Sequence, residues 1–123
     1  MSRIEVSMSE TAELTTPLIR ALNQTGGWAE RMNSGIARKG RYTVHLHGKG
    51  TADILFFPLH PNQPRGLKGA YCRPVWIETK QPKGTTAKEQ INAQAAFREK
   101  VENLGHRYIM VRSIAECFDA LGL

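Results

Sequence analysis

Apolar residues recur along this chain at two spacings, one typical of helices and the other typical of strands. After Ser9, apolar residues at every third or fourth position predict a helix that Gly26 and Gly27 terminate. Pro17 fits a helix only in its first turn, which leaves open a start later than Ser9.

Two further helices are predicted in the second half of the chain. Thr85 or Thr86 caps a helix over residues 87–104, which Gly105 ends. The predicted apolar stripe of this helix consists of Ile91, Ala95, Phe97, Val101 and Leu104. A last helix follows Ser113, and its predicted buried face consists of Ile114, Cys117, Phe118 and Leu121.

Short apolar segments rich in β-branched and aromatic residues predict strands. These segments are residues 28–32, 52–57, 75–80 and 107–111. Residues 42–47 alternate and predict one more strand, after a basic turn that contains Arg38, Lys39 and Arg41. A long proline-rich loop is expected over residues 58–74. The helices and apolar strands follow the order αβββαβα, which indicates an α/β fold in a single domain, residues 1–123.

Composition narrows the possible partners and compartments. The chain has 123 residues, a net charge of +6 and a pI near 9.7, which favours a polyanionic partner such as nucleic acid. Cys72 and Cys117 form no CxxC pair, so we expect a reducing compartment rather than a disulfide framework. We expect a cytoplasmic protein, because no apolar run approaches the ~20 residues of a membrane span and no secretory leader is evident.

Charged residues inside two of the apolar segments indicate chemistry. Asp53 lies in one segment, and Glu78 and Lys80 lie in the next. Charges in such places are usually paired or bind metal. Glu78 and Lys80 are expected on one face of their strand, while Thr79 points to the other face and offers its backbone carbonyl. Carboxylate oxygens suit Mg²⁺ or Mn²⁺, and such an ion activates water against a phosphate.

Several motifs together resemble the VRR-NUC domain, a branch of the PD-(D/E)xK nuclease superfamily. They are the Gly-Thr-Ala-Asp-Ile run at residues 50–54, Ile-Glu-Thr-Lys at 77–80 and Pro-Lys-Gly at 82–84. Gln90, the Arg-Met-Asn-Ser-Gly run at residues 31–35 and the closing strand before Ser113 add to the match. The chain departs from the family pattern at Ala52, where a proline usually precedes the aspartate, and in the long loop.

The resemblance implies a restriction-endonuclease-like αβββαβ core, with a mixed central sheet flanked by helices. It implies that Asp53 and Glu78 are ligands of Mg²⁺ or Mn²⁺, that Lys80 is the catalytic lysine, and that Gln90 reaches the site from the long helix. A glutamate of the first helix often completes such sites, and Glu13 is preferred here over Glu10. The implied activity is that of a homodimeric endodeoxyribonuclease that cuts branched DNA such as Holliday junctions.

Other residues carry weaker expectations. The residues expected to contact DNA phosphates are Arg31, Arg38, Lys39, Arg41, Lys49, Arg65 and Lys68. His45 and His47 alternate on one strand, but without nearby cysteine partners we favour packing or proximity to DNA over zinc. Gln94 is interpreted as an ordinary surface residue. Two alternative functions remain: a non-catalytic nucleic-acid-binding module, and a sequence-specific nuclease of the restriction type.

Overall fold

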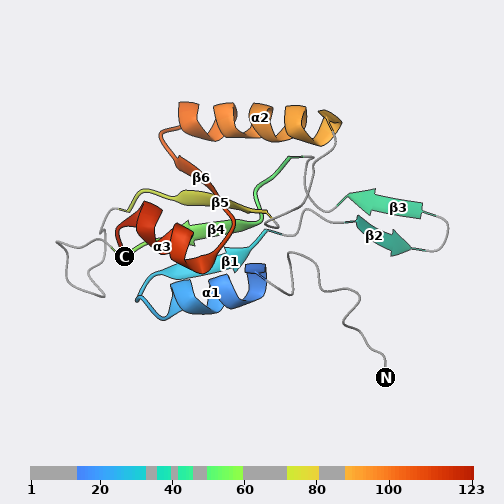
Figure 1. Ribbon diagram of the computed structural model, residues 1–123. Helices are drawn as coiled ribbons and strands as arrows, with labels where there is room; N and C mark the ends of the chain where they lie inside the picture. The colour runs from blue at the N-terminus through green and yellow to red at the C-terminus, as the bar shows by residue number, and fades with distance from the viewer. Residues whose placement is uncertain (1–13, 33–35, 40–41, 46–49, 60–71, 81–87) are drawn as a thin grey trace, which may run out of the picture.

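The computed structural model describes residues 14–32, 36–39, 42–45, 50–59, 72–80 and 88–123, and these residues form a mixed α/β fold (Figure 1). In chain order, the elements are α1 (Thr16–Asn23), β1 (Trp28–Arg31), β2 (Ile36–Lys39), β3 (Tyr42–His45), β4 (Ile54–Phe57), β5 (Val75–Thr79), α2 (Lys88–Asn103), β6 (Arg107–Val111) and α3 (Ile114–Leu121). The prediction of an α/β fold is confirmed. None of the described helices is both long and apolar enough to cross a lipid bilayer.

The central sheet is mixed and, among the described strands, has the order β1-β4-β5-β6. β4 runs antiparallel to both β1 and β5, whereas β6 runs parallel to β5 after the crossover through α2. With the separate β2–β3 pair set aside, the elements follow the predicted order αβββαβα.

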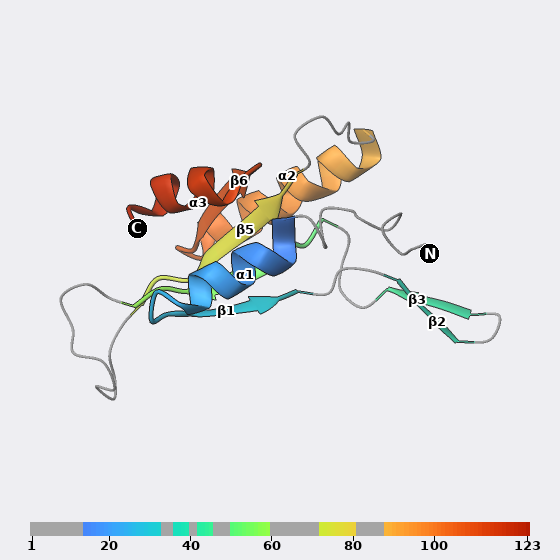
Figure 2. The ribbon, with the colours of Figure 1, turned by 60° about the horizontal axis from the view of Figure 1, so that its bottom comes forward.

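Helices cover the two faces of this sheet unequally. Figures 1 and 2 show α1 and α3 on one face and α2 on the other. Alternation along β5 sends Val75 and Ile77 into the larger apolar cluster, together with Leu18 and Leu22 of α1 and Cys117 of α3. This larger cluster is the main core of the domain.

The α2 face carries a smaller cluster of Ala52, Val101 and Tyr108, against which Trp76 and Phe97 pack. The predicted stripe of α2 is confirmed only at Phe97 and Val101. Ile91 is 50% exposed, Ala95 is also exposed, and Leu104 is 67% exposed. Spacing alone cannot show where a helix extends past the sheet beneath it.

The sequence predicted the ends of the helices more accurately than it predicted β2. Pro17 lies in the first turn of α1, which begins at Thr16 and thus later than Ser9. Ser113 caps α3 by accepting a hydrogen bond from the Glu116 amide.

The predicted basic turn is wrong for Arg38 and Lys39, because both lie in β2, which pairs with β3. Long charged side chains have a low strand propensity, so this strand depends on its pairing partner rather than on its own sequence.

Candidate active site

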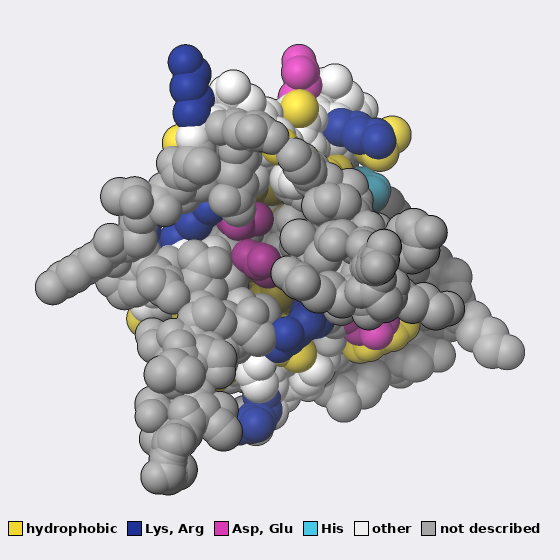
Figure 3. Space-filling model, turned by 90° about the vertical axis from the view of Figure 1, so that its right-hand side faces the viewer, with side chains coloured by type: hydrophobic (Ala, Val, Ile, Leu, Met, Phe, Trp, Pro, Cys, Tyr) yellow, Lys and Arg dark blue, Asp and Glu magenta, His cyan; other side chains and the backbone are white. Residues whose placement is uncertain are grey.

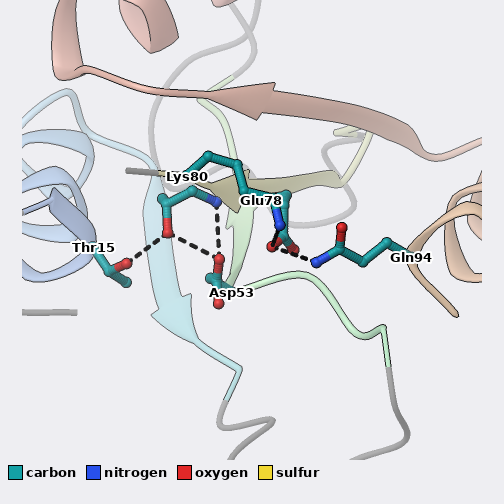
Figure 4. A network of polar contacts seen from close by, with 6 residues as sticks. Thr15, Asp53, Glu78, Lys80 and Gln94 are labelled. Atoms are coloured by element: carbon teal, nitrogen blue, oxygen red, sulfur yellow. Dashed lines mark hydrogen bonds and ion pairs between the residues drawn. The ribbon is translucent and has the colours of Figure 1, made fainter. Parts of the chain in front are cut away.

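Strand register brings the two predicted metal ligands together. Ile54 of β4 lies opposite Ile77 of β5 in the last pair between these strands, so Asp53 and Glu78 both lie at this end of the pair. The Asp53 carboxylate accepts hydrogen bonds from the Thr79 hydroxyl and backbone N–H, so it does not follow the regular alternation of β4. Figure 4 shows Asp53 and Glu78 as neighbours there, and Lys80 follows β5.

Asp53 is held by Thr79. Its Oδ2 atom accepts hydrogen bonds from the Thr79 backbone N–H and from the Thr79 hydroxyl, both at 2.9 Å. The Thr79 oxygen also lies 2.8 Å from the Thr15 hydroxyl oxygen. Because Thr79 has one hydroxyl proton and gives it to Asp53, Thr15 must donate in that second bond. Thr79 thus points away from the face of Glu78, as predicted, while its carbonyl as a metal ligand stays a prediction.

Glu78 and Lys80 are buried together. Their residues are only 4% and 8% exposed, and Lys80 Nζ lies 3.5 Å from Glu78 Oε2. The same Oε2 atom accepts a hydrogen bond of 3.0 Å from the Gln94 side-chain amide. A buried carboxylate requires such compensation, and these two partners fix its orientation.

Gln94 is the functional candidate that the sequence interpretation missed. It lies in α2 one helical turn beyond Gln90, whose side chain falls outside the described part of the structure. The signal available in the sequence was the spacing of four residues, which puts both glutamines on the same side of the helix. The structure brings Gln94 to Glu78 and leaves the predicted role of Gln90 untested.

Gly50 explains how α2 reaches the site. Its φ of +83° lies in the left-handed region. A Cβ atom there would stand 2.2 Å from the Ala93 carbonyl oxygen and 2.8 Å from the backbone nitrogen of Gln94. The turn before Asp53 and the α2 backbone therefore touch directly. This contact requires glycine and ties the position of Gln94 to the segment that leads into Asp53.

Aromatic side chains close the α2 side of the site. Trp76 packs edge-on against Phe97 at 5.1 Å, and Phe97 lies 6.3 Å from Tyr108 between ring centroids. Burial, followed by the negative charge of Glu78, raises the pKa of Tyr108 well above its usual range, so this phenol stays neutral.

Figure 3 views the end of the molecule toward which the hairpin projects, with acidic side chains near the middle of the surface and basic ones nearby. Arg31, expected to contact DNA, is exposed and donates a 2.7 Å hydrogen bond to the Thr16 hydroxyl. The neighbouring residue, Met32, donates its backbone N–H to the Asp53 carbonyl at 2.7 Å. Arg31 is therefore close in sequence and space to the candidate site.

The remaining expectations fall largely outside the described residues. Glu10, Glu13, Arg41, Lys49, Arg65 and Lys68 lie in ranges that the structure does not describe. The backbones of Arg38 and Lys39 lie in β2 and that of His45 in β3, but their side chains are outside the description. The predicted DNA contacts of these residues thus stay predictions.

The donor set fits a hard divalent cation. Asp53 and Glu78 offer carboxylate oxygens, and Mg²⁺ is commonly held by one or two carboxylates with waters completing its shell. Among the described residues there is no group of three His, Cys, Asp or Glu side chains placed to bind a metal. A third carboxylate ligand would have to come from the segments outside that description, where Glu13 lies, whereas the predicted Thr79 carbonyl is a backbone oxygen of a described residue.

Comparisons of this chain with protein-family models, curated proteins and solved structures found no match. The VRR-NUC resemblance therefore stays an inference from the motifs at residues 50–54 and 77–80.

Proposed function

We propose that this protein is a metal-dependent endodeoxyribonuclease with a restriction-endonuclease-like core. The observation that carries the proposal is the convergence of Asp53, Glu78 and Lys80 at one end of the β4–β5 pair. Two carboxylates and a buried ammonium in one place suit phosphodiester hydrolysis better than they suit a structural core.

Asp53 and Glu78 would hold the ion, which is Mg²⁺ or Mn²⁺. When bound, such an ion polarises the phosphate and lowers the pKa of a coordinated water. Lys80 is placed beside Glu78 to orient the attacking water or to stabilise negative charge on the phosphate. The water oxygen bonds to phosphorus, the P–O3′ bond breaks, and the departing O3′ takes a proton, which leaves a 5′-phosphate.

The charge of the chain supports nucleic acid as the substrate. A net charge of +6 on 123 residues attracts phosphates over long distances. The family resemblance favours branched DNA such as Holliday junctions, and a homodimer whose two sites cut two strands.

A cleavage panel tests the proposal. Four-way junctions, flaps, linear duplexes and single strands are incubated with Mg²⁺ or Mn²⁺ and either the wild-type protein or Glu78→Gln. The matched control is Glu102→Gln, an exposed carboxylate that pairs with Arg98 on α2. We expect cleavage by the wild type and the control only. Equal cleavage by Glu78→Gln would exclude Glu78 as a metal ligand.

The alternative is a non-catalytic nucleic-acid-binding module. One observation favours it: Asp53 and Glu78 already accept hydrogen bonds from Thr79 and Gln94, so both carboxylates also have structural partners. DNA binding by the wild type without cleavage of any substrate in the panel would support this alternative. Cleavage at one sequence of linear duplex, regardless of branching, would instead support a restriction-type nuclease.

A further inference from the structure

The β2–β3 hairpin is inserted at the edge of the candidate site. The chain leaves the central sheet after β1 and returns to it at β4, and the hairpin lies between these two strands in sequence. Met32, the first residue beyond β1, donates its backbone N–H to the Asp53 carbonyl at 2.7 Å. The segment that carries the hairpin therefore begins directly beside a predicted metal ligand.

The hairpin is separate from the central sheet. β2 and β3 pair only with each other among the described strands, from Ile36 opposite His45 to Lys39 opposite Tyr42. Figures 1 and 2 both show the pair projecting away from the helices and the sheet.

The charge of this segment is of one sign. Between Glu30 and Asp53 the sequence contains no acidic residue, whereas the hairpin region contributes Arg38, Lys39 and Arg41. The stretch between Asp53 and Glu78 also carries only basic charges, at Arg65, Lys68 and Arg73. A ribbon with only positive charge is suited to a polyanion, because phosphate neutralisation releases counterions.

The dimensions of the hairpin fit the major groove of B-DNA better than the minor groove. Two paired strands lie about 4.8 Å apart, and four residues extend roughly 13 Å. The major groove of B-DNA is about 12 Å wide and 8.5 Å deep and admits a two-stranded ribbon, while the minor groove is only about 6 Å wide. We propose that the β2–β3 hairpin enters the major groove of a duplex arm next to the phosphate that the Asp53–Glu78 site cuts.

This inference rests on the proposed function for the cut phosphate and adds to it the form of the substrate. The hairpin requires double-stranded DNA beside the site, so a duplex arm is part of what the protein recognises. Contact with phosphates by Arg38 and Lys39 supplies affinity without sequence preference.

Binding without metal tests the hairpin independently of cleavage. Fluorescence anisotropy in EDTA measures affinity for a 20-base-pair duplex as salt is varied, for the wild type and for Arg38→Ala/Lys39→Ala. The control is Arg20→Ala/Lys100→Ala, which removes the same charge from exposed positions of α1 and α2. We expect the hairpin variant to bind at least tenfold more weakly, with a salt slope smaller by about 2, and the control to bind like the wild type.

Dimethyl sulfate footprinting identifies the groove, since it methylates guanine N7 in the major groove and adenine N3 in the minor groove. The wild type should protect guanine N7, and the hairpin variant should not. Protection of adenine N3 alone, or identical footprints for both proteins, would overturn the inference. Melting curves check that each variant folds. If Arg38→Ala/Lys39→Ala does not fold, Arg38→Gln/Lys39→Gln is used in its place.

The outcomes separate the two proposals. If the wild type cleaves DNA but the hairpin variant binds duplex DNA as tightly as the wild type does, the proposed DNA contact of the hairpin is rejected and the nuclease proposal is retained. If the hairpin is needed for guanine protection but the protein cleaves no DNA, the proposed DNA contact of the hairpin is retained and the nuclease proposal is rejected. Failure of the wild type to bind duplex DNA would reject the hairpin inference.

Discussion

Asp53 accepts two hydrogen bonds on one oxygen, Oδ2, from the backbone and the hydroxyl of the same residue, Thr79. Thr79 in turn receives a hydrogen bond from Thr15, so a hydroxyl relay links the start of α1 to a predicted metal ligand. Thr15 and Thr79 are 3% and 0% exposed, which makes this relay part of the buried structure.

Thr79→Val should destabilise the protein by about 1–3 kcal/mol, because the buried Thr15 hydroxyl and Asp53 each lose a partner. Urea denaturation measures the change in the free energy of unfolding. Thr79→Ser keeps the hydroxyl and should lose less than about half of that stability. A larger loss for serine than for valine would show that the methyl group, not the relay, matters.

Gly50→Ala should lower the free energy of unfolding much more than Gly105→Ala. Both glycines have a left-handed φ, +83° and +87°, so both substitutions incur about 1–2 kcal/mol of backbone strain. Only Gly50 has a neighbour in the way, the Ala93 carbonyl, whereas a Cβ at Gly105 meets nothing within 4 Å. We expect an additional loss of at least about 2 kcal/mol for Gly50→Ala, measured by urea denaturation. Equal losses would contradict the close packing of α2.

Lys80→Met should destabilise the protein by about 3 kcal/mol, because it leaves the Glu78 carboxylate buried without its cation. The double variant Glu78→Gln/Lys80→Met removes both charges and should recover at least about 1 kcal/mol of that loss. Urea unfolding of both variants, and of Glu78→Gln alone, gives the coupling free energy of the pair. Neither variant should cleave DNA, which separates the stability of the pair from its chemistry.

Gln94→Ala should lower the cleavage rate by about tenfold to a hundredfold, because partners that orient a metal-ligating carboxylate have effects of this size. Asn92→Ala, at an exposed position of the same helix, serves as the control and should have no effect. Gln90→Ala measured in parallel shows which glutamine acts. A rate unchanged by Gln94→Ala and reduced by Gln90→Ala would support the role that the family resemblance implies for Gln90.

Alkaline pH should lower the free energy of unfolding, because the Cys117 thiol ionises more easily in the unfolded chain. Burial raises the pKa of the Cys117 thiol to about 11 from an ordinary value of 9.0. Well below pH 9 the thiol is protonated in both states, so its contribution to stability is complete. As the pH rises from 9 to 11 the unfolded chain loses the proton first, and this contribution falls by roughly 2–3 kcal/mol. Cys117→Ala should show a flatter stability profile across this range; parallel profiles would refute the assignment to Cys117.

Patterns with a local cause were predictable. Short apolar runs identified β4 and β5, although both predicted strands were too long: Asp53 precedes β4 and Lys80 follows β5. Pro17 and Gly105 likewise marked helix ends through their own backbone restrictions.

Features that depend on distant neighbours were not predictable from the same patterns. The contact between Gln94 and Glu78 joins residues 16 apart in the sequence, and it depends on how α2 is placed by Gly50. The bond between Thr15 and Thr79 spans 64 residues. β2 was missed for a similar reason, since pairing with β3 imposes a strand on a sequence with little preference for one.

The small apolar cluster beneath α2 has a consequence for motion. Among the residues whose burial is described, Ala52, Val101 and Tyr108 are its buried members, whereas ten buried residues join α1 and α3 to the opposite face of the sheet. A layer with less buried apolar area separates at a lower free energy than the whole domain unfolds. Amide hydrogen exchange in α2 should therefore be faster than in β5. Each opening of α2 would release Gln94 from Glu78, so the site is complete only while its least stable layer is closed.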